Sequence, residues 1–184
     1  SCIGDIGTHA FQMTEYLTGM EVKSILSDLN MVYDDNSLDL DGTVLIRFSK
    51  TIKGVIRASQ IATGEENGLT VAIYGKNGAF KWEQENPNIL YHITDDKPKS
   101  IIKPGHAFVS DVANDGTKLP GGHPEGIFDA MGNIYKGVAK ALRNEDAFDG
   151  EYPNMNDGVR GMLFIEKVVE SNKNGNVWVH LDNQ

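Results

Sequence analysis

The sequence has one cysteine, Cys2, so no disulfide can form within the chain, and a reducing compartment, the cytoplasm, is the expected location. It is also poor in basic residues, with 17 lysines and arginines against 26 aspartates and glutamates and a formal net charge of −9. This acidic balance disfavours nucleic acids and anionic membranes as partners. No apolar run reaches membrane-spanning length, and no signal-peptide pattern is present.

Several motifs are missing as well. Neither a Walker loop nor G-x-G-x-x-G occurs, so nothing in the sequence would hold a nucleotide phosphate by itself. None of the five histidines lies in H-E-x-x-H or near a cysteine pair, which gives a metal site little support. What is present is a chain of 184 residues with 40% hydrophobic and 23% charged residues. Such a composition is typical of a soluble globular protein, and we expect one domain over residues 1–184.

The stretch 1–20 is the most informative part of the chain. Its apolar residues recur at spacings of four and three, which predicts an amphipathic helix that ends near Gly19. Asp5 follows a glycine and is predicted to be the N-cap. His9 comes four residues later, so both side chains should lie on one helix face. An imidazole beside a carboxylate suits acid–base chemistry. The alternative is that Asp5 only caps the helix and His9 is an ordinary surface or core histidine.

The rest of the chain predicts an α+β fold. Apolar residues alternate with a period of two in several segments joined by short turns, including Asn77-Gly78, which predicts a largely antiparallel sheet. Helical spacing then returns before a last short strand. The predicted strands are 21–32, 44–48, 53–62, 69–74, 79–83, 90–94, 99–103 and 177–181, and the predicted helices are 125–143 and 157–172. Two faces of such a sheet need covering and few helices are available, so we expect self-association.

Further polar residues stand at predicted loop positions. Gln60, Glu65 and Asn67 would lie at the end of a central strand and could bind a polyhydroxylated ligand. His123 lies in Leu119–Gly126 (LPGGHPEG), where Pro-Gly-Gly bends the chain and Pro124 suits the first turn of the next helix. This histidine is either a polar side chain at the rim of a cleft or part of a plain loop that leads into a helix.

Five blocks then identify a resemblance to a family. The sequence resembles the C-terminal domain of Gfo/Idh/MocA oxidoreductases, the group that contains glucose–fructose oxidoreductase and inositol dehydrogenases. The resemblance covers essentially the whole chain. The blocks, in order, are GDIGTHA (4–10), SQIATGEENGL (59–69), YGKNGAFKWEQENPNIL (74–90), LPGGHPEGIFDAMGNIY (119–135) and DGVRGMLFIEKVVESN (157–172).

The resemblance implies an open, mostly antiparallel sheet with helices on one face, as in the C-terminal domains of dihydrodipicolinate reductase and glyceraldehyde-3-phosphate dehydrogenase. It also implies hydride transfer between NAD or NADP and a sugar or cyclitol, and a homo-oligomer formed through the exposed sheet face. The family's Rossmann domain, with its glycine-rich turn and Glu-Lys-Pro motif, is absent from these 184 residues. The chain is therefore expected to be the substrate-binding and oligomerisation domain, a piece that carries half of an active site.

The resemblance further implies roles for individual residues. Asp5 and His9 match the family's D-x-x-x-H, with His9 as the acid or base at the reacting oxygen. His123 matches a substrate-side histidine, and Gln60 and Asn67 are candidates for binding hydroxyls. Two alternatives remain open at this point. One is an NAD-dependent relative that cleaves glycosides without net redox change, and the other is a non-catalytic dimerisation or sugar-binding module.

Overall fold

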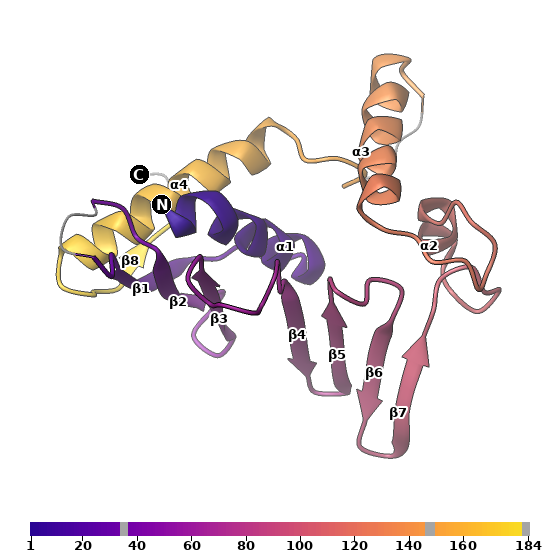
Figure 1. Ribbon diagram of the computed structural model, residues 1–184, viewed down its shortest axis with the longest axis horizontal. Coiled ribbons are helices and arrows are strands. Elements are labelled where there is room, and N and C mark those ends of the chain that lie inside the picture. Colours follow the sequence, from indigo (N-terminus) through magenta and orange to yellow (C-terminus); the bar gives the residue numbers. More distant parts are fainter. Residues whose placement is uncertain (34–36, 146–149, 182–184) are drawn as a thin grey trace. The chain divides into compact units, whose positions relative to one another are not determined.

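The computed structural model describes residues 1–33, 37–145 and 150–181 (Figure 1). The chain divides into two compact units, of which the first comprises Ser1–Gly64 and Pro153–Gln184 and the second Glu65–Tyr152. Helices and antiparallel sheets occur in both, which confirms the predicted α+β class. The sequence predicted one open sheet, whereas the structure has two four-stranded antiparallel sheets, one in each unit.

The first unit begins with a helical run of two kinds. A π-helical segment, η1 (Ile3–Gly7), leads directly into the helix α1 (Thr8–Thr18). Gly19 ends α1 in the left-handed conformation, with φ of 64°, and donates its N–H to the Glu15 carbonyl. The predicted stop at Gly19 is therefore confirmed, and glycine suits it because it adopts this conformation without steric cost.

The sheet of the first unit has the strand order β3-β2-β1-β8. Its members are β1 (Ser24–Asn30), β2 (Asp41–Arg47), β3 (Lys53–Ser59) and β8 (Val179–His180). Ile25, Val44, Ile46 and Ile56 are buried on one face, as their two-residue spacing predicts. The strand β2 begins at Asp41, three residues before the strand predicted over 44–48.

Helices cover that buried face. The helix α4 (Met155–Lys173) packs on β1 and α1, and the rings of Phe11 and Phe164 stack with centroids 4.3 Å apart (Figure 1). Buried polar groups in this layer are paired, since the hydroxyl of Ser27 donates to the Val168 carbonyl and Ser171 accepts the Ser27 N–H. The helices thus lie on one face of this sheet, as predicted.

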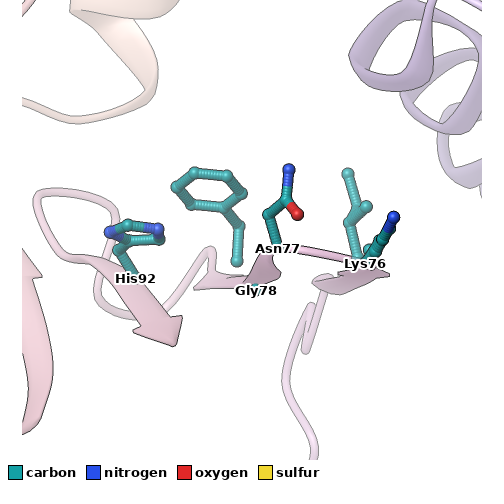
Figure 2. A pocket seen from close by; sticks show the side chains of 7 residues that line it. Lys76, Asn77, Gly78 and His92 are labelled. Carbon is teal, nitrogen blue, oxygen red and sulfur yellow. The ribbon is translucent and has the colours of Figure 1, made fainter. Parts of the chain in front are cut away.

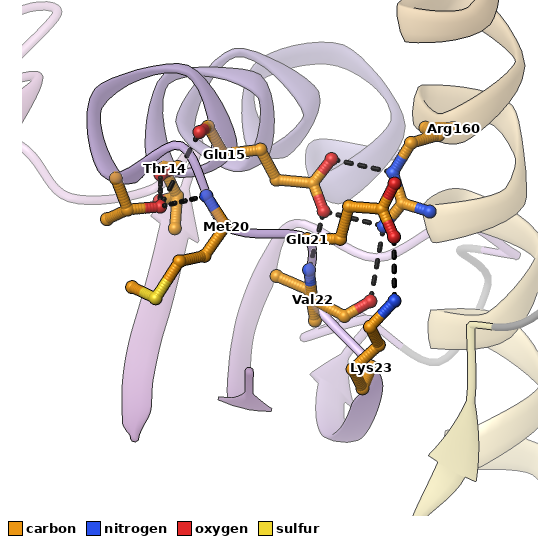
Figure 3. A network of polar contacts seen from close by, with 8 residues as sticks. Thr14, Glu15, Met20, Glu21, Val22, Lys23 and Arg160 are labelled. Atoms are coloured by element: carbon orange, nitrogen blue, oxygen red, sulfur yellow. Dashed lines mark hydrogen bonds and ion pairs between the residues drawn. The ribbon is translucent and has the colours of Figure 1, made fainter. Parts of the chain in front are cut away.

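A salt bridge joins the two helices of the first unit (Figure 3). The carboxylate of Glu15 in α1 accepts hydrogen bonds from Nε and Nη2 of Arg160 in α4, at 2.7 and 2.6 Å. The same carboxylate accepts the Val22 N–H at 2.6 Å, and Arg160 Nη2 also donates to the Val22 carbonyl at 3.1 Å. The pair therefore fixes α1, α4 and the segment before β1 against one another.

The second unit holds a four-stranded antiparallel sheet in the order β4-β5-β6-β7. Its strands are β4 (Thr70–Gly75), β5 (Gly78–Glu83), β6 (Leu90–Thr94) and β7 (Lys97–Ile102), joined in sequence by short turns (Figure 1). Gly75 pairs with Gly78 across the turn that contains Asn77, which confirms the predicted hairpin. Local turn chemistry and alternating apolar residues are sufficient to specify this meander.

Two helices follow the meander. The segment between β7 and the next long helix contains the short helix α2 (Asp111–Gly116). The Ser110 hydroxyl caps this helix by accepting the Ala113 N–H. The helix α3 (Ile127–Leu142) confirms the prediction for 125–143. Its N-cap is Gly126, which donates its N–H to Asp129. Pro124 therefore precedes the helix and does not occupy its first turn, so that prediction is wrong.

Candidate functional site

The N-terminal helical run is anchored by Asp39, a residue far along the chain. The Asp39 carboxylate accepts the Ile3 N–H at 2.8 Å, and its backbone carbonyl accepts the Cys2 N–H at 2.8 Å. Asp39 is only 4% exposed. These bonds satisfy amides that the first turn of a helix leaves without intrahelical partners. Asp39 thus does the work that the sequence pattern assigned to Asp5.

A missing side chain at Gly42 lets this run lie close to the sheet. A Cβ at this position would come within 3.0 Å of Ile3 and 2.9 Å of Leu29. Ile3 therefore packs directly over β2, and the first turn of the run is fixed against the sheet.

Asp5 lies inside η1 and is not an N-cap, so that prediction is wrong. The helical run begins before it, and its backbone N–H donates to the Ser1 carbonyl at 3.0 Å. The Asp5 carboxylate is exposed and accepts a hydrogen bond from Nε2 of Gln60 at 3.1 Å. Gln60 directly follows β3, and its own N–H donates to the Leu40 carbonyl at 2.8 Å. The fold thus joins two predicted site residues that lie 55 positions apart.

His9 is the second residue of α1 and is exposed. In the part of the chain that the structure describes, no hydrogen bond or ion pair connects the His9 ring to Asp5. Both residues nevertheless belong to one continuous helical run that starts with a π-helical segment. Such segments are uncommon and occur frequently at functional sites, where they change the direction of side chains. An orienting role of Asp5 toward His9 stays a prediction.

His123 and Asn67 belong to the second unit. Asn67 is exposed in the loop before β4, where Gly68 donates its N–H to Glu85 at 3.3 Å. His123 is also exposed, and its backbone N–H and its Nδ1 both lie 3.1 Å from the Pro120 carbonyl oxygen. The chain turns directly before His123, where Gly122 has a positive φ of 89°, as the Pro-Gly-Gly sequence predicts. Asp5, His9 and Gln60 belong to the first unit.

The second unit also has an apolar hollow of about 310 Å³ at the β4–β5 hairpin (Figure 2). Phe80 and His92 form one wall, with stacked rings whose centroids are 4.8 Å apart. Lys76 and Asn77 of the turn form its rim. None of the predicted site residues lines it. His92 lies on the sheet surface, as its strand pattern predicts.

Within residues 1–33, 37–145 and 150–181, no three His, Cys, Asp or Glu side chains are grouped so that they could hold a metal ion. In the same ranges, no helix has both the length and the apolar character needed to cross a membrane.

Known proteins show the same combination of sequence and fold. A model of the GFO/IDH/MocA C-terminal domain matches residues 1–81. This range includes Asp5 in η1, His9 in α1 and Gln60 directly after β3. A crystal structure of an oxidoreductase from Sinorhizobium meliloti is 35% identical and superimposes with a TM-score of 0.90 over 97% of this chain. Residues 1–81 are therefore those of a Gfo/Idh/MocA C-terminal domain.

Two further proteins are similar to the chain in sequence or in fold. The uncharacterised oxidoreductase YfiI of Bacillus subtilis (strain 168) is 28% identical over 185 residues, which is 96% of this chain. An inositol dehydrogenase homologue from Azotobacter vinelandii, in complex with NADH and myo-inositol, has a TM-score of 0.82 and 23% identity over 97% of this chain. The chain spans about half the length of these proteins: 47% of YfiI, 51% of the Sinorhizobium protein and 49% of the Azotobacter protein.

Some residues that shape the site were not identified from the sequence. Asp39 stands in Asp39-Leu40-Asp41-Gly42, which has the composition of a turn, and its contact with Ile3 spans 36 positions. Glu125 and Asn88, which hold the loop around His123, also contact residues distant in sequence. The available signal was weak: an asparagine in a Pro-Asn turn, and a glutamate just before a helix.

Proposed function

We propose that the chain is the substrate-side domain of an NAD(P)-dependent oxidoreductase that moves hydride between nicotinamide and a hydroxyl or ketone carbon of a sugar or cyclitol. The match of residues 1–81 to the Gfo/Idh/MocA C-terminal domain supports this reaction class. The Azotobacter protein, crystallised with NADH and myo-inositol, supports a nicotinamide cofactor and a polyol substrate. The single cysteine, which is buried, suits a reducing cytoplasm.

The observation that carries the proposal is the contact between Asp5 and Gln60. It joins the D-x-x-x-H segment to the end of β3, so that the polar side chains of Asp5 and Gln60 meet at one end of the sheet. We assign His9 to removing the hydroxyl proton as hydride leaves the substrate carbon, and to returning it in the reverse direction. Asp5 stabilises the charged imidazolium. The Gln60 amide holds Asp5 through Nε2, and its Oε1 can accept a substrate hydroxyl.

The cofactor itself requires residues beyond those of this chain. The 184 residues contain no glycine-rich dinucleotide loop, so they do not fit the pyrophosphate of NAD(P). Bound nicotinamide accepts or supplies the hydride. The residues of this chain would bind hydroxyls, where Asn67 and His123 are the further candidates, and would move the proton at His9.

We also propose that the outer face of the first sheet is buried between subunits. Leu26 lies opposite Leu45, and Leu45 lies opposite Val55, which gives an apolar row across three strands. Val55 is 64% exposed and Leu45 39% exposed. An apolar row on an open sheet face is typical of an interface, and a twofold-symmetric homodimer would cover it.

The test uses the full-length protein that contains this chain, purified and mixed with NAD or NADP and a panel of inositols, aldoses and aldonates. We expect the absorbance of the reduced cofactor to increase with at least one polyol. We expect this increase to be lost in the His9→Asn variant. Release of phenol from aryl glycosides without reduced cofactor would instead favour the glycoside-cleaving reaction. Absence of turnover together with absence of NAD(P) binding by calorimetry would reject the oxidoreductase and leave a non-catalytic module.

A further inference from the structure

The loop that carries His123 closes on the carboxylate of Glu125. Glu125 Oε1 accepts the backbone N–H groups of both Lys118 and Leu119, the latter at 2.6 Å. An ionised carboxylate that accepts two amides makes stronger hydrogen bonds than a neutral acceptor. The two ends of the segment 118–125 are thereby tied together, and the residues between them form a closed loop.

A second set of bonds ties this loop to the sheet of the same unit. Asn88, in the connection between β5 and β6, donates from Nδ2 to the Glu125 carbonyl at 2.8 Å and accepts the Glu125 N–H on Oδ1 at 3.0 Å. The amide of Asn88 thus pairs with the backbone of Glu125 as a neighbouring strand would. Close backbone packing adds to this, because a Cβ on Gly105 would lie 2.8 Å from the Gly121 nitrogen.

His123 stands at the tip of this closed loop, and the geometry determines which ring nitrogen carries the proton. Its Nδ1 lies 3.1 Å from the Pro120 carbonyl oxygen. A carbonyl oxygen can only accept, so Nδ1 must donate and carries the proton. In the neutral ring, Nε2 is then the acceptor, and the exposed side chain leaves it available to a ligand.

We propose that Glu125 and Asn88 are positioning residues that hold His123 with Nε2 ready to accept a hydrogen bond from a ligand hydroxyl. The proposal rests on the proposed function, because that function assigns a polyol to this protein. A side chain that is already ordered loses less conformational freedom when the ligand binds, so the loop increases affinity without touching the ligand. Glu125 and Asn88 take no part in the chemistry.

The kinetic test compares Glu125→Ala, Asn88→Ala and His123→Ala in the full-length enzyme. Each should raise KM for the polyol by about threefold to tenfold, the value of one hydrogen bond, with kcat within about twofold of wild type. Glu125→Gln should restore near-normal KM, because its amide oxygen still accepts both N–H groups. Glu83→Ala, an exposed glutamate on β5, is the control and should change neither parameter. The double variant Glu125→Ala/His123→Ala should be no worse than His123→Ala alone.

A second measurement does not depend on turnover. In the 184-residue chain, ¹⁵N NMR of the imidazoles at neutral pH should show His123 in the Nδ1–H tautomer, and Glu125→Ala should return it to the mixture of a free histidine. A free-histidine mixture in the wild-type chain would overturn the proposal. So would an unchanged KM in Glu125→Ala when KM rises in His123→Ala. If His123 has the fixed tautomer but the protein turns over no polyol, the proposed function is rejected. The description of the loop would then hold, but its ligand would not be a polyol.

Discussion

Glu15 and Arg160, which lie 145 positions apart, form a two-pronged salt bridge whose carboxylate also holds the N–H of Val22 (Figure 3). Their side chains are only 16% and 23% exposed. Such a pair is shielded from water and salt more than a surface pair, and its loss leaves several groups without partners. It therefore fixes the position of α1, the helix that carries His9, against α4.

The first prediction follows from this pair. Glu15→Ala should lower the free energy of unfolding of the chain by about 2–4 kcal/mol, because the Arg160 charge and the Val22 N–H both lose their acceptor. Urea unfolding followed by circular dichroism measures this change. The control is Glu21→Ala, which breaks an exposed pair with Lys23 and should cost less than about 1 kcal/mol. Equal losses in the two variants would contradict the prediction.

The local pattern of this sequence predicted most of its secondary structure. Strands β2 to β7 follow from two-residue alternation and from turns such as the one at Asn77, all of which depend on neighbours in the sequence. The start of the first helix did not follow, because the residue that anchors it, Asp39, contacts Ile3 across 36 positions. The division into two sheets depends on which strand edges stay unpaired, and the alternation of side chains carries no information on this.

The candidate site shows the same limit. Asp5, His9, Gln60, Asn67 and His123 could be named from residue type, position and resemblance. The hydrogen bond between Gln60 and Asp5 could not be predicted. It forms only because the pairing of three strands places the end of β3 beside η1. Likewise, the Pro-Gly-Gly turn predicted an exposed His123, whereas Glu125 and Asn88 act through contacts that span 6 and 37 positions.

The second prediction concerns His9 in the full-length enzyme. His9→Asn keeps a polar side chain but cannot transfer a proton, so kcat should fall by about 10²–10⁴-fold. Cofactor affinity should change little, because this chain lacks the dinucleotide loop. Steady-state kinetics under conditions where hydride transfer limits the rate, shown by a deuterium isotope effect, make the measurement. A near-normal kcat in His9→Asn would show that His9 is an ordinary surface residue with no role in proton transfer.

The third prediction separates two roles for Gln60. If its amide positions Asp5, Gln60→Glu should reduce kcat more than Gln60→Ala does, because it replaces a donor with a second carboxylate 3.1 Å from the first. If Gln60 only binds a substrate hydroxyl, both variants should raise KM by similar factors and leave kcat unchanged. Asp5→Asn provides the comparison. It should reduce kcat without lowering stability, since Asp39 and not Asp5 anchors the helix start.

The fourth prediction concerns the outer face of the first sheet. Val55→Lys places a charge at the most exposed position of the apolar row formed with Leu26 and Leu45, and should convert the oligomer into a monomer at tens of micromolar. Sedimentation velocity measures the change, and unchanged circular dichroism shows that the fold persists. Met162→Lys, on the exposed side of α4, is the control and should keep the oligomer. A wild-type protein that is already monomeric would refute the proposed interface.

The last prediction uses the single cysteine as a probe of the N-terminal run. Cys2 is fully buried. Burial, followed by the nearby Asp39 carboxylate, raises the pKa of its thiol from 9.0 to about 11. In the native state the thiol should therefore stay protonated and inaccessible, and a thiol reagent at pH 8 should label it only as fast as the segment opens. In urea, labelling should be immediate.

The raised pKa also fixes the direction of a pH effect. Between pH 9 and about 11 the unfolded thiol ionises while the folded thiol keeps its proton, so the unfolded state gains free energy of ionisation that the folded state does not. The stability of the wild-type chain relative to Cys2→Ala should thus be constant below pH 9 and fall through this window. Taking the difference between the two variants removes the titration of lysines and tyrosines. Met162→Cys in the Cys2→Ala background, an exposed thiol on α4, should label at once at pH 8. Fast labelling of Cys2 itself in the native protein would show that the Asp39 anchor does not hold the helix start closed.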